Sequence, residues 1–517
     1  MNAYTQVAPS SPTCHVAKLP EDPRIHRVIR LSSCRTLAGG TSHYGCAVGL
    51  RGRIIGLSAC AAIVLGSLAP SLPAEGAHRA HHLVSFEDSP RAVATATGGP
   101  VTTQWCLTNW KFACYTPSQM QAAYDLGPLF TSTKVPGGYQ GQGQTIAIID
   151  PYGSPTITTD LTAFDSAFSL PAPPSFTVLT PPGLAPVPAF KSSNADMMGW
   201  AGETTLDVEW AHAMAPKASI LLVTTPTDEV EGTSGLAEIV AAENYVIKNK
   251  LATVISQSFG ATEQTFTSAA AVNPYRSAFI AASTAGVSVL AATGDAGATD
   301  YQSNGTSYFS KPVIDWPASD PLVTAVGGTL VSLSAQGSHA SPDVAWNDTY
   351  NTAVTSTPFP NATGGGLSTF FSRPTYQAGL TAGSSKARST PDISMSAACS
   401  GEVEVYETFG GSTGWYTTCG TSESTPMFAG IVALADQVAG HGLGPLNPKI
   451  YSLASQPGAG IVDVTSGNNT VQFPTIVKGV STPVIVKGFN ALAGYDLASG
   501  VGTIDAAKFV PALAAAP

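Results

Sequence analysis

The segment CGTSESTP, residues 419–426, leads directly into an apolar stretch from Met427 to Val438. A glycine turn, small hydroxyl residues and a proline are typical of the first turn of a helix, where a missing N–H costs little. Ser422 is therefore predicted at a helix N-terminus, where free N–H groups and the positive end of the helix dipole can stabilise an oxyanion. Taken alone, the Gly-Thr-Ser triplet favours a simple helix cap.

Upstream of this segment, short apolar runs alternate with helical patterns. Runs such as QTIAIID (144–150) and ASILLV (218–223) are continuous and apolar, as buried parallel strands are. Further strands are expected at 252–256, 287–293 and 322–326, and helices at 115–130, 158–168, 203–215, 234–249 and 275–285. This alternation predicts an α/β protein with a doubly wound parallel sheet, helices on both faces, and a single large domain.

Glu203 and Asp207 lie four residues apart in GETTLDVEW (202–210), inside one of the predicted helices. At this spacing both side chains project from the same helix face. On an exposed face they would be an ordinary solvated pair, which is the common case. In a buried site they would share a proton, and one of them could act as a general base.

Composition limits the class of protein. The chain has 517 residues, of which 44% are hydrophobic and 11% charged, enough for one large core. Residues 92–517 carry 15 Lys/Arg and 29 Asp/Glu, so they are not expected to bind nucleic acid. The low charge density limits self-repulsion when carboxylates become protonated, which is compatible with function in an acidic environment.

The N-terminal region is predicted to direct export. Arg51 and Arg53 precede an apolar run, residues 54–69, that is short for a membrane span. A signal peptide at 51–74 is therefore expected, and the protein is expected to be secreted without stable membrane association; an uncleaved anchor is the alternative. Residues 1–50 are then an unstructured extension or an erroneous start, 75–104 a linker, and 105–517 the folded domain.

The cysteines fall into two groups. Four of the eight lie in or before the predicted signal: Cys14, Cys34, Cys46 and Cys60. The others form two local pairs, Cys106/Cys114 and Cys399/Cys419. An even number after cleavage predicts two disulfides in an oxidising compartment, with four buried thiols as the alternative.

The 419–426 segment closely resembles the nucleophile motif of the sedolisin (serine-carboxyl) peptidases, a family of the subtilisin-like clan. Other motifs similar to the family's follow in the family's order between about Tyr115 and Val501. They are GETTLDVEW (202–210), TGDAG (293–297), WPASD (316–320), AVGGT (325–329), GGGLS (364–368), RPTYQ (373–377) and PDIS (391–394). Several motifs in one order are far more specific than any one of them.

The resemblance implies a secreted, acid-active endopeptidase with a subtilisin-like fold, acting as a monomer on protein or peptide substrates. Ser422 would attack the peptide carbonyl, and Glu203 would take its proton and return it to the leaving amine. Asp207 would hydrogen-bond Glu203 and orient it. Asp295 would face the developing oxyanion and must be protonated to donate a hydrogen bond to it. Activity is therefore expected to be highest in acid.

Asp150 ends a predicted strand where subtilisins carry their triad aspartate, and the carboxyl ends of such strands form sites. In some sedolisins an acidic residue here extends the hydrogen-bond network to a tryptophan. Phe259 stands at the position of that tryptophan, so no such relay is expected. Asp150 is predicted to be a structural turn residue, with a supporting role in the site as the alternative.

Asp463 and Asp496 lie in segments that resemble the family's calcium loop, which implies one structural Ca²⁺. The implied ligands are these two side chains and the carbonyls of Val464, Leu492 and Gly494. The family usually has glycine where Leu492 stands. From spacing alone the two aspartates would be turn residues, and the β-rich segment 468–491 between them has no predicted place.

Two other classes of protein stay open. A subtilisin-type Asp/His/Ser protease needs a histidine near its serine, but His212 follows Asp207 on the same predicted helix and lacks a His-Gly-Thr context. A secreted binding protein could keep the fold without turnover. The family's large N-terminal prodomain is not expected here, because only about thirty residues separate Ala74 from Trp105.

Overall fold

The computed structural model describes residues 91–92, 98–383, 386–477 and 479–517. The predicted extension and signal peptide, most of the predicted linker, and Cys14, Cys34, Cys46 and Cys60 lie outside the described residues.

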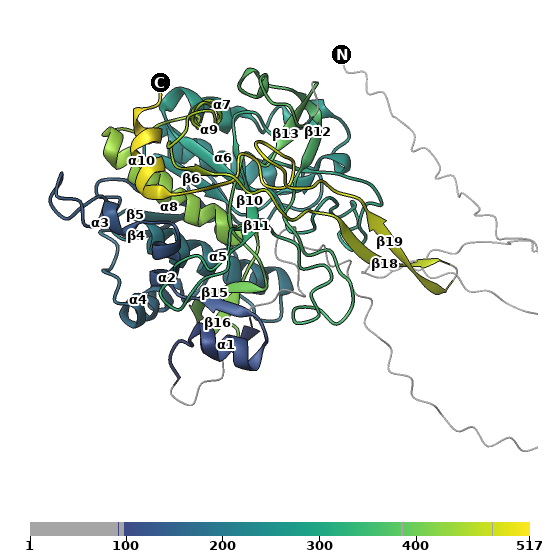
Figure 1. Ribbon diagram of the computed structural model, residues 1–517, viewed down its shortest axis with the longest axis horizontal. Helices are drawn as coiled ribbons and strands as arrows, with labels where there is room; N and C mark the ends of the chain where they lie inside the picture. Colours follow the sequence, from purple (N-terminus) through teal and green to yellow (C-terminus); the bar gives the residue numbers. More distant parts are fainter. Residues whose placement is uncertain (1–90, 93–97, 384–385, 478) are drawn as a thin grey trace, which may run out of the picture. The chain divides into compact units, whose positions relative to one another are not determined.

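An eight-stranded sheet forms the centre of the described chain, with helices on both of its faces (Figure 1). The strand order is β11-β10-β8-β6-β3-β5-β4, and β14 also pairs with β10. Neighbours in the sheet are parallel except β10 and β11, which are antiparallel. The strands are β3 (Thr145–Ile149), β4 (Phe176–Leu179), β5 (Ser219–Val223), β6 (Val254–Gln257), β8 (Ser288–Ala292), β10 (Thr324–Leu330), β11 (Val344–Ala345) and β14 (Ile393–Ser396). The predicted doubly wound α/β fold is confirmed, with one antiparallel strand added at an edge.

Both faces of the sheet are buried, which explains why its strands are continuous apolar runs. Ile146 and Ile148 of β3 belong to the core layer shared with α5 and α8. Ala147 and Ile149 belong to the opposite layer, shared with α6 and α7. The helices are α1 (Thr103–Asn109), α2 (Pro117–Ala123), α3 (Gly127–Phe130), α4 (Ile157–Phe168), α5 (Ala195–Met214), α6 (Leu236–Lys248), α7 (Ser277–Ala285), α8 (Thr421–Ala439), α9 (Asn447–Ala454) and α10 (Ala506–Ala515).

The central helices α5 and α8 pack against each other. A Cβ atom at Gly430 would lie 2.6 Å from the Met214 Cβ, so glycine allows the close approach of the two helices. Helix α8 is buried from Thr421 to Asp436, because α5, α10 and strands of the central sheet pack around it. This pair carries the residues that the sequence predicts to be catalytic.

Three helix predictions differ from the structure. The segment 115–130 forms two short helices, α2 and α3, because Asp125 between them is left-handed (φ 54°). Helix α5 begins eight residues before Glu203, where the Asn194 side chain accepts a hydrogen bond from the Met197 N–H at 2.9 Å. Helix α8 begins at Thr421, so Pro426 lies inside the helix and cannot donate to the Ser422 carbonyl as a residue four positions later normally does.

A second, four-stranded sheet lies beside the central one. Its order is β1 (Arg91–Ala92), β16 (Gly414–Thr418), β15 (Gly401–Glu407) and β2 (Ala113–Tyr115). The disulfide Cys106–Cys114 joins α1 to β2, and Cys399–Cys419 joins the segments before β15 and α8. Both predicted disulfides are therefore confirmed.

The segment without a predicted place, 468–491, forms a β-hairpin of β18 (Val471–Val477) and β19 (Val480–Val486). It extends away from the central sheet in Figure 1. Val471, Phe473 and Val486 at its base pack on Ala298 and Ala362. The other short strands are β7 (Ala261–Thr262), β9 (Asp315–Trp316), β12 (Gly366–Ser372), β13 (Ala387–Thr390), β17 (Ile461–Val462) and β20 (Thr503–Ile504).

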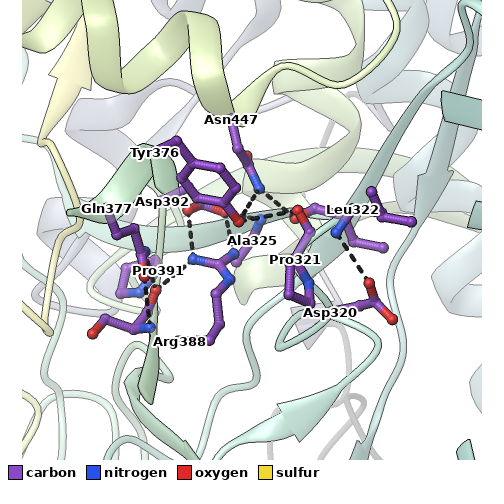
Figure 2. Close-up of polar contacts among 12 residues, drawn as sticks. Asp320, Pro321, Leu322, Ala325, Tyr376, Gln377, Arg388, Pro391, Asp392 and Asn447 are labelled. Carbon is purple, nitrogen blue, oxygen red and sulfur yellow. Dashed lines mark hydrogen bonds and ion pairs between the residues drawn. The ribbon is translucent and has the colours of Figure 1, made fainter. Parts of the chain in front are cut away.

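A buried polar network explains two of the motifs, RPTYQ (373–377) and PDIS (391–394). Figure 2 shows the Arg388 guanidinium against the Asp392 carboxylate, with an Nη1–Oδ1 distance of 2.7 Å. Asp392 also accepts hydrogen bonds from the Ala325 N–H (2.8 Å) and the Tyr451 hydroxyl (2.8 Å). Gln377 donates to the same hydroxyl at 2.7 Å. The network ties strand β10 to the chain around β14 and α9.

Candidate active site

Ser422 lies in the first turn of α8 and is only 2% exposed. The chain enters this turn through Gly420, whose φ of 112° is unfavourable for other residues. A Cβ atom at position 420 would lie 2.6 Å from Asp295 Oδ2. Glycine therefore lets the predicted nucleophile and the predicted oxyanion residue approach each other.

Asp295 follows β8, at the carboxyl end of a parallel strand, where sites form in sheets of this kind. Its Oδ1 accepts hydrogen bonds from the Thr421 N–H (2.7 Å) and the Thr421 hydroxyl (2.8 Å). Because Oδ1 is held as an acceptor, Oδ2 is the oxygen that can carry a proton. The structure thus orients the half-buried Asp295 carboxyl through the residue next to Ser422.

Glu203 and Asp207 lie on α5 and are buried, with 4% and 0% of their surfaces exposed. Burial raises the pKa of the Glu203 carboxyl well above its ordinary value, and the Ser422 hydroxyl opposes this shift. Burial also raises the pKa of Asp207, and the charges of Asp150 and Glu203 add to the shift. The acid pair is therefore not the solvated face that its spacing alone favours.

Ser258 connects the acid pair and was not singled out from the sequence. It follows β6, and its hydroxyl donates to Asp207 Oδ1 at 2.9 Å. The same hydroxyl lowers the pKa of Glu203. Within the described residues no hydrogen bond joins Glu203 directly to Asp207. The position of Ser258 just after a predicted strand could have indicated a site residue, because the carboxyl ends of parallel strands form sites.

Asp150 is a third buried carboxyl of this cluster. It follows β3, is fully buried, and neither of its oxygens has a hydrogen bond of standard geometry in the described chain. Burial raises its pKa to about 7, and Thr204 opposes this. Its charge raises the pKa of both Glu203 and Asp207. The sequence favoured a turn residue here and left a supporting role as the alternative, because burial of a strand end depends on the packing around it.

Phe259 stands at the position of the family's tryptophan. Its ring packs edge-on against the ring of Trp200 on α5, with centroids 6.2 Å apart. The expected lack of a tryptophan relay stays a prediction.

None of the three histidines in the described residues approaches Ser422. His212 Nε2 lies 2.9 Å from the Pro171 carbonyl and 3.2 Å from Asp165 Oδ1. His339 pairs with Asp343 at 2.9 Å. His441 Nδ1 lies 2.9 Å from the carbonyl of the next residue. The geometry therefore gives no support to a subtilisin-type histidine.

The predicted calcium loop is assembled from both sides of the β18–β19 hairpin. Asp463 Oδ2 accepts from the Gly494 N–H, and Asp496 Oδ2 from the Leu492 N–H, both at 2.8 Å. The Ser499 hydroxyl lies 3.4 Å from the Val464 carbonyl. Among the described residues, no group of three or more His, Cys, Asp or Glu side chains could share a metal ion. Two carboxylates with backbone carbonyls are nevertheless hard oxygen donors of the kind calcium uses.

Leu492 does not obstruct this loop. Its side chain is 57% exposed, so solvent accommodates the bulk that a glycine would lack. The convergence of the two segments is therefore compatible with the five implied ligands.

The fold is of the subtilisin-like class, and its central helices carry Ser422 and the buried carboxyls of Glu203 and Asp207. Residues 196–449 match the model of the subtilase family. The chain is 29% identical over 405 residues to kumamolisin of Bacillus sp. (strain MN-32), covering 77% of this chain and 63% of that protein. It is 28% identical over 398 residues to sedolisin of Pseudomonas sp. (strain 101), covering 76% of this chain and 60% of that protein.

A solved structure agrees with these matches. The structure of Pseudomonas sedolisin, a serine-carboxyl proteinase complexed with two molecules of pseudo-iodotyrostatin, superposes with a TM-score of 0.63 at 25% identity. It covers 77% of this chain and 97% of that chain. By sequence and by structure the chain is similar to members of the sedolisin family. It spans less than two thirds of the length of kumamolisin and of sedolisin.

No helix in the described part of the chain combines the length and the hydropathy needed to cross a membrane.

Proposed function

We propose that this protein is an acid-active serine-carboxyl peptidase that hydrolyses peptide bonds in proteins or peptides. Ser422 is the nucleophile, Glu203 the general base and acid, Asp207 its orienting partner and Asp295 the oxyanion donor. The observation that carries this proposal is that Thr421, next to Ser422, binds Asp295, while helix α8 packs on helix α5, which carries the buried Glu203 and Asp207.

In the proposed reaction, Ser422 Oγ bonds to the carbonyl carbon of the substrate while Glu203 takes the hydroxyl proton. The carbonyl oxygen becomes negative and accepts a hydrogen bond from the protonated Oδ2 of Asp295. The C–N bond then breaks, and Glu203 gives its proton to the leaving amine. Water repeats these steps on the acyl-enzyme and restores the serine.

Burial suits these roles in acid. The pKa values of Glu203 and Asp207 are raised mainly by burial, so the pair holds a proton at a pH where exposed carboxylates are ionised. Ser258 and the charge on one member favour a state in which the pair shares one proton. Such a pair can take and return a proton near an acidic working pH.

The test of this proposal is a pH–activity profile on an unfolded protein substrate. Ser422→Ala is expected to lower kcat by about 10³-fold or more, as loss of a nucleophile does. Glu203→Gln is expected to do the same, because glutamine cannot take the proton. Ser424→Ala is the matched control, since its hydroxyl only donates to the Thr421 carbonyl at 2.9 Å. Full activity of the Glu203→Gln protein, or an optimum at neutral pH, would contradict the proposal.

A second variant addresses the oxyanion donor. In Asp295→Asn the amide oxygen can still accept from Thr421, and the amide N–H₂ donates at every pH. The loss of activity on raising the pH should therefore become shallower in this variant, while the thermal unfolding temperature in acid stays near that of the wild type. A profile identical in shape to the wild type would remove Asp295 from the oxyanion role.

We also propose one structural Ca²⁺, held by the side chains of Asp463 and Asp496 and the carbonyls of Val464, Leu492 and Gly494. The contact between the Asp463 segment and the 492–496 segment supports this proposal. A bound cation would balance the negative charge of the two carboxylates. The two disulfides and the signal-like sequence at 51–74 support secretion. A monomer, and a peptidase domain at 105–517, remain predictions from the sequence.

A further inference from the structure

Glu423 is a buried acid that is adjacent in the sequence to the proposed nucleophile. It follows Ser422 in the first turn of α8, and none of its surface is exposed. Its N–H donates to the Gly420 carbonyl at 2.9 Å, which closes the turn that presents Ser422. Neither of its carboxyl oxygens has a hydrogen bond of standard geometry in the described residues. The steps proposed above make no use of this side chain.

The groups that face Glu423 are acids, phenols and a hydroxyl. They come from several elements: Asp295 after β8, Ser396 on β14, Glu402 on β15, Tyr115 on β2 and Tyr124 after α2. The charge of Asp343 raises the pKa of the same two tyrosines. Within the described chain no salt bridge connects Glu423 to a basic side chain. An ionised Glu423 would therefore be surrounded by groups that repel or fail to neutralise it.

The start of α8 and the Ser396 hydroxyl are the features that favour a negative charge at this place. A helix N-terminus offers about half a positive charge and stabilises a nearby carboxylate modestly. Removal of a carboxylate from water costs more free energy than this, so the balance is against ionisation. Burial accordingly raises the pKa of Glu423 well above its ordinary value of 4.5, the charges of Glu402 and Asp295 add to this, and Ser396 opposes it.

We propose that Glu423 is a positioning residue whose protonated form keeps the nucleophile turn of α8 in place. On ionisation the carboxylate must reach water, which displaces the turn and switches the site off at higher pH. The predicted loss of turnover rests on the proposed peptidase function. The displacement of the turn does not, and it can be measured without any substrate. Because Thr421 holds Asp295 and Ser422 carries the nucleophile, one movement disturbs both halves of the site.

The direction of the pH effect follows from linkage. The folded state binds the Glu423 proton more tightly than the unfolded chain does, so its contribution to stability is fully present below about pH 4.5. That contribution is lost as the pH rises through the pKa of the folded state. The effect therefore adds a second reason for inactivation at high pH, separate from ionisation of Asp295.

The test compares the full chain with Glu423→Gln, which keeps the shape of the side chain and cannot ionise. Hydrogen exchange of a peptide spanning residues 419–427 is measured near pH 4.5 and near pH 7.5, together with turnover. At the higher pH the wild type is expected to exchange about tenfold faster than the variant, and at the lower pH the two should agree. The variant should also remain active to higher pH.

Glu404→Gln is the matched control. Glu404 is another buried acid, on β15, whose pKa is raised to about 8 mainly by burial, but its carboxylate accepts from the Val101 N–H and is not among the groups whose charge acts on Glu423. It should leave exchange at 419–427 as in the wild type. Equal exchange in wild type and Glu423→Gln at both pH values, or equal protection by Glu404→Gln, would overturn the proposal.

Two further outcomes keep the hypotheses distinct. If all variants lack turnover but the exchange difference persists, the peptidase function fails and the role of Glu423 stands. If Glu423→Gln does not fold, Glu423→Met provides a neutral side chain of similar length. Failure of both variants to fold near pH 4.5 would show that the carboxyl acts through contacts rather than through its charge, and would reject the switch.

Discussion

The side chains around Ser422 differ from ordinary surface residues mainly in their contact with water. Asp150, Asp207 and Glu203 are all at least 96% buried, and all have raised pKa values because the charged forms lose solvation. Ionisation of all three buried carboxyls of this cluster would carry a large free-energy cost. The cluster is consequently suited to acidic conditions, where its members are wholly or partly neutral.

Asp150→Asn tests this at a single residue. The pKa of Asp150 is about 7 in the folded protein against about 3.8 in the unfolded chain, so its neutral form stabilises the fold fully below about pH 3.8. This contribution is lost as the pH rises through 7. Asparagine stays neutral, so the variant should unfold at a higher temperature than the wild type near pH 8.

Near pH 3.5 the two proteins should unfold at the same temperature. The difference at high pH is expected to be about 1–4 kcal/mol, since each tenfold change in proton affinity corresponds to about 1.4 kcal/mol. Calorimetry at the two pH values measures it. A variant that is destabilised equally at both would show that Asp150 is held by contacts other than its charge.

The secondary-structure elements decide where these side chains meet. Helix α5 presents the acid pair, β8 ends at Asp295, and α8 begins at the nucleophile turn. The close packing of α5 on α8 at Gly430 and the contact of Gly420 with Asp295 both require the absence of a side chain. The network around Asp392 in Figure 2 holds β10 and the β14 region, on which the neighbouring elements pack.

Asp392→Ala tests the importance of that network for the elements it joins. Arg388 is fully buried, and loss of its partner leaves a guanidinium unpaired inside the protein. Breaking a buried pair in this way costs about 3–5 kcal/mol, so the unfolding temperature should fall markedly across the whole pH range where the protein is folded.

Lys508→Ala is the control for this effect. Lys508 pairs with Asp505 on the surface, where water already solvates both charges, so its removal should have little effect on the unfolding temperature. If Asp392→Ala were as mild as Lys508→Ala in chemical or thermal unfolding, the buried network would not be a determinant of stability.

At the scale of the whole folded body, distant segments close around the ends of the central sheet. The β18–β19 hairpin packs on the loop after Asp295, through Val471 and the Ala298 N–H, which donates to the Asn469 carbonyl at 2.9 Å. The two parts of the proposed calcium loop flank this same hairpin. A bound ion would therefore stabilise a region that reaches the oxyanion side of the site.

Removal of calcium is expected to lower the stability of the whole body. A ligand present at about 100 times its Kd stabilises the folded state by about 2.7 kcal/mol, so a chelator should lower the unfolding temperature by several degrees. Added Ca²⁺ should restore it more fully than Mg²⁺, which prefers a smaller octahedral site. In the double variant Asp463→Asn/Asp496→Asn, unfolding should no longer respond to either treatment. An unchanged wild-type unfolding temperature in chelator would reject the ion.

Local sequence patterns determined five strands of the central sheet (β3, β5, β6, β8 and β10), most helices, the α/β class and the two disulfide pairs of this protein, because apolar periodicity and nearby cysteines act over short distances along the chain. Helix ends were less accurate, since the Asn194 cap and the start of α8 depend on single contacts. The motifs also indicated Glu203, Asp207, Asp295 and Ser422, but their roles remain to be tested.

Only the tertiary structure decided how these groups meet. Thr421 binds Asp295 across 126 positions of the chain, and Ser258 binds Asp207 across 51. Packing of several elements around Asp150 and Glu423 removes their water, and no pattern of neighbouring residues reveals that loss. The residue types therefore state which chemistry is available, whereas burial and contacts between distant segments set the charge and orientation with which each group can act.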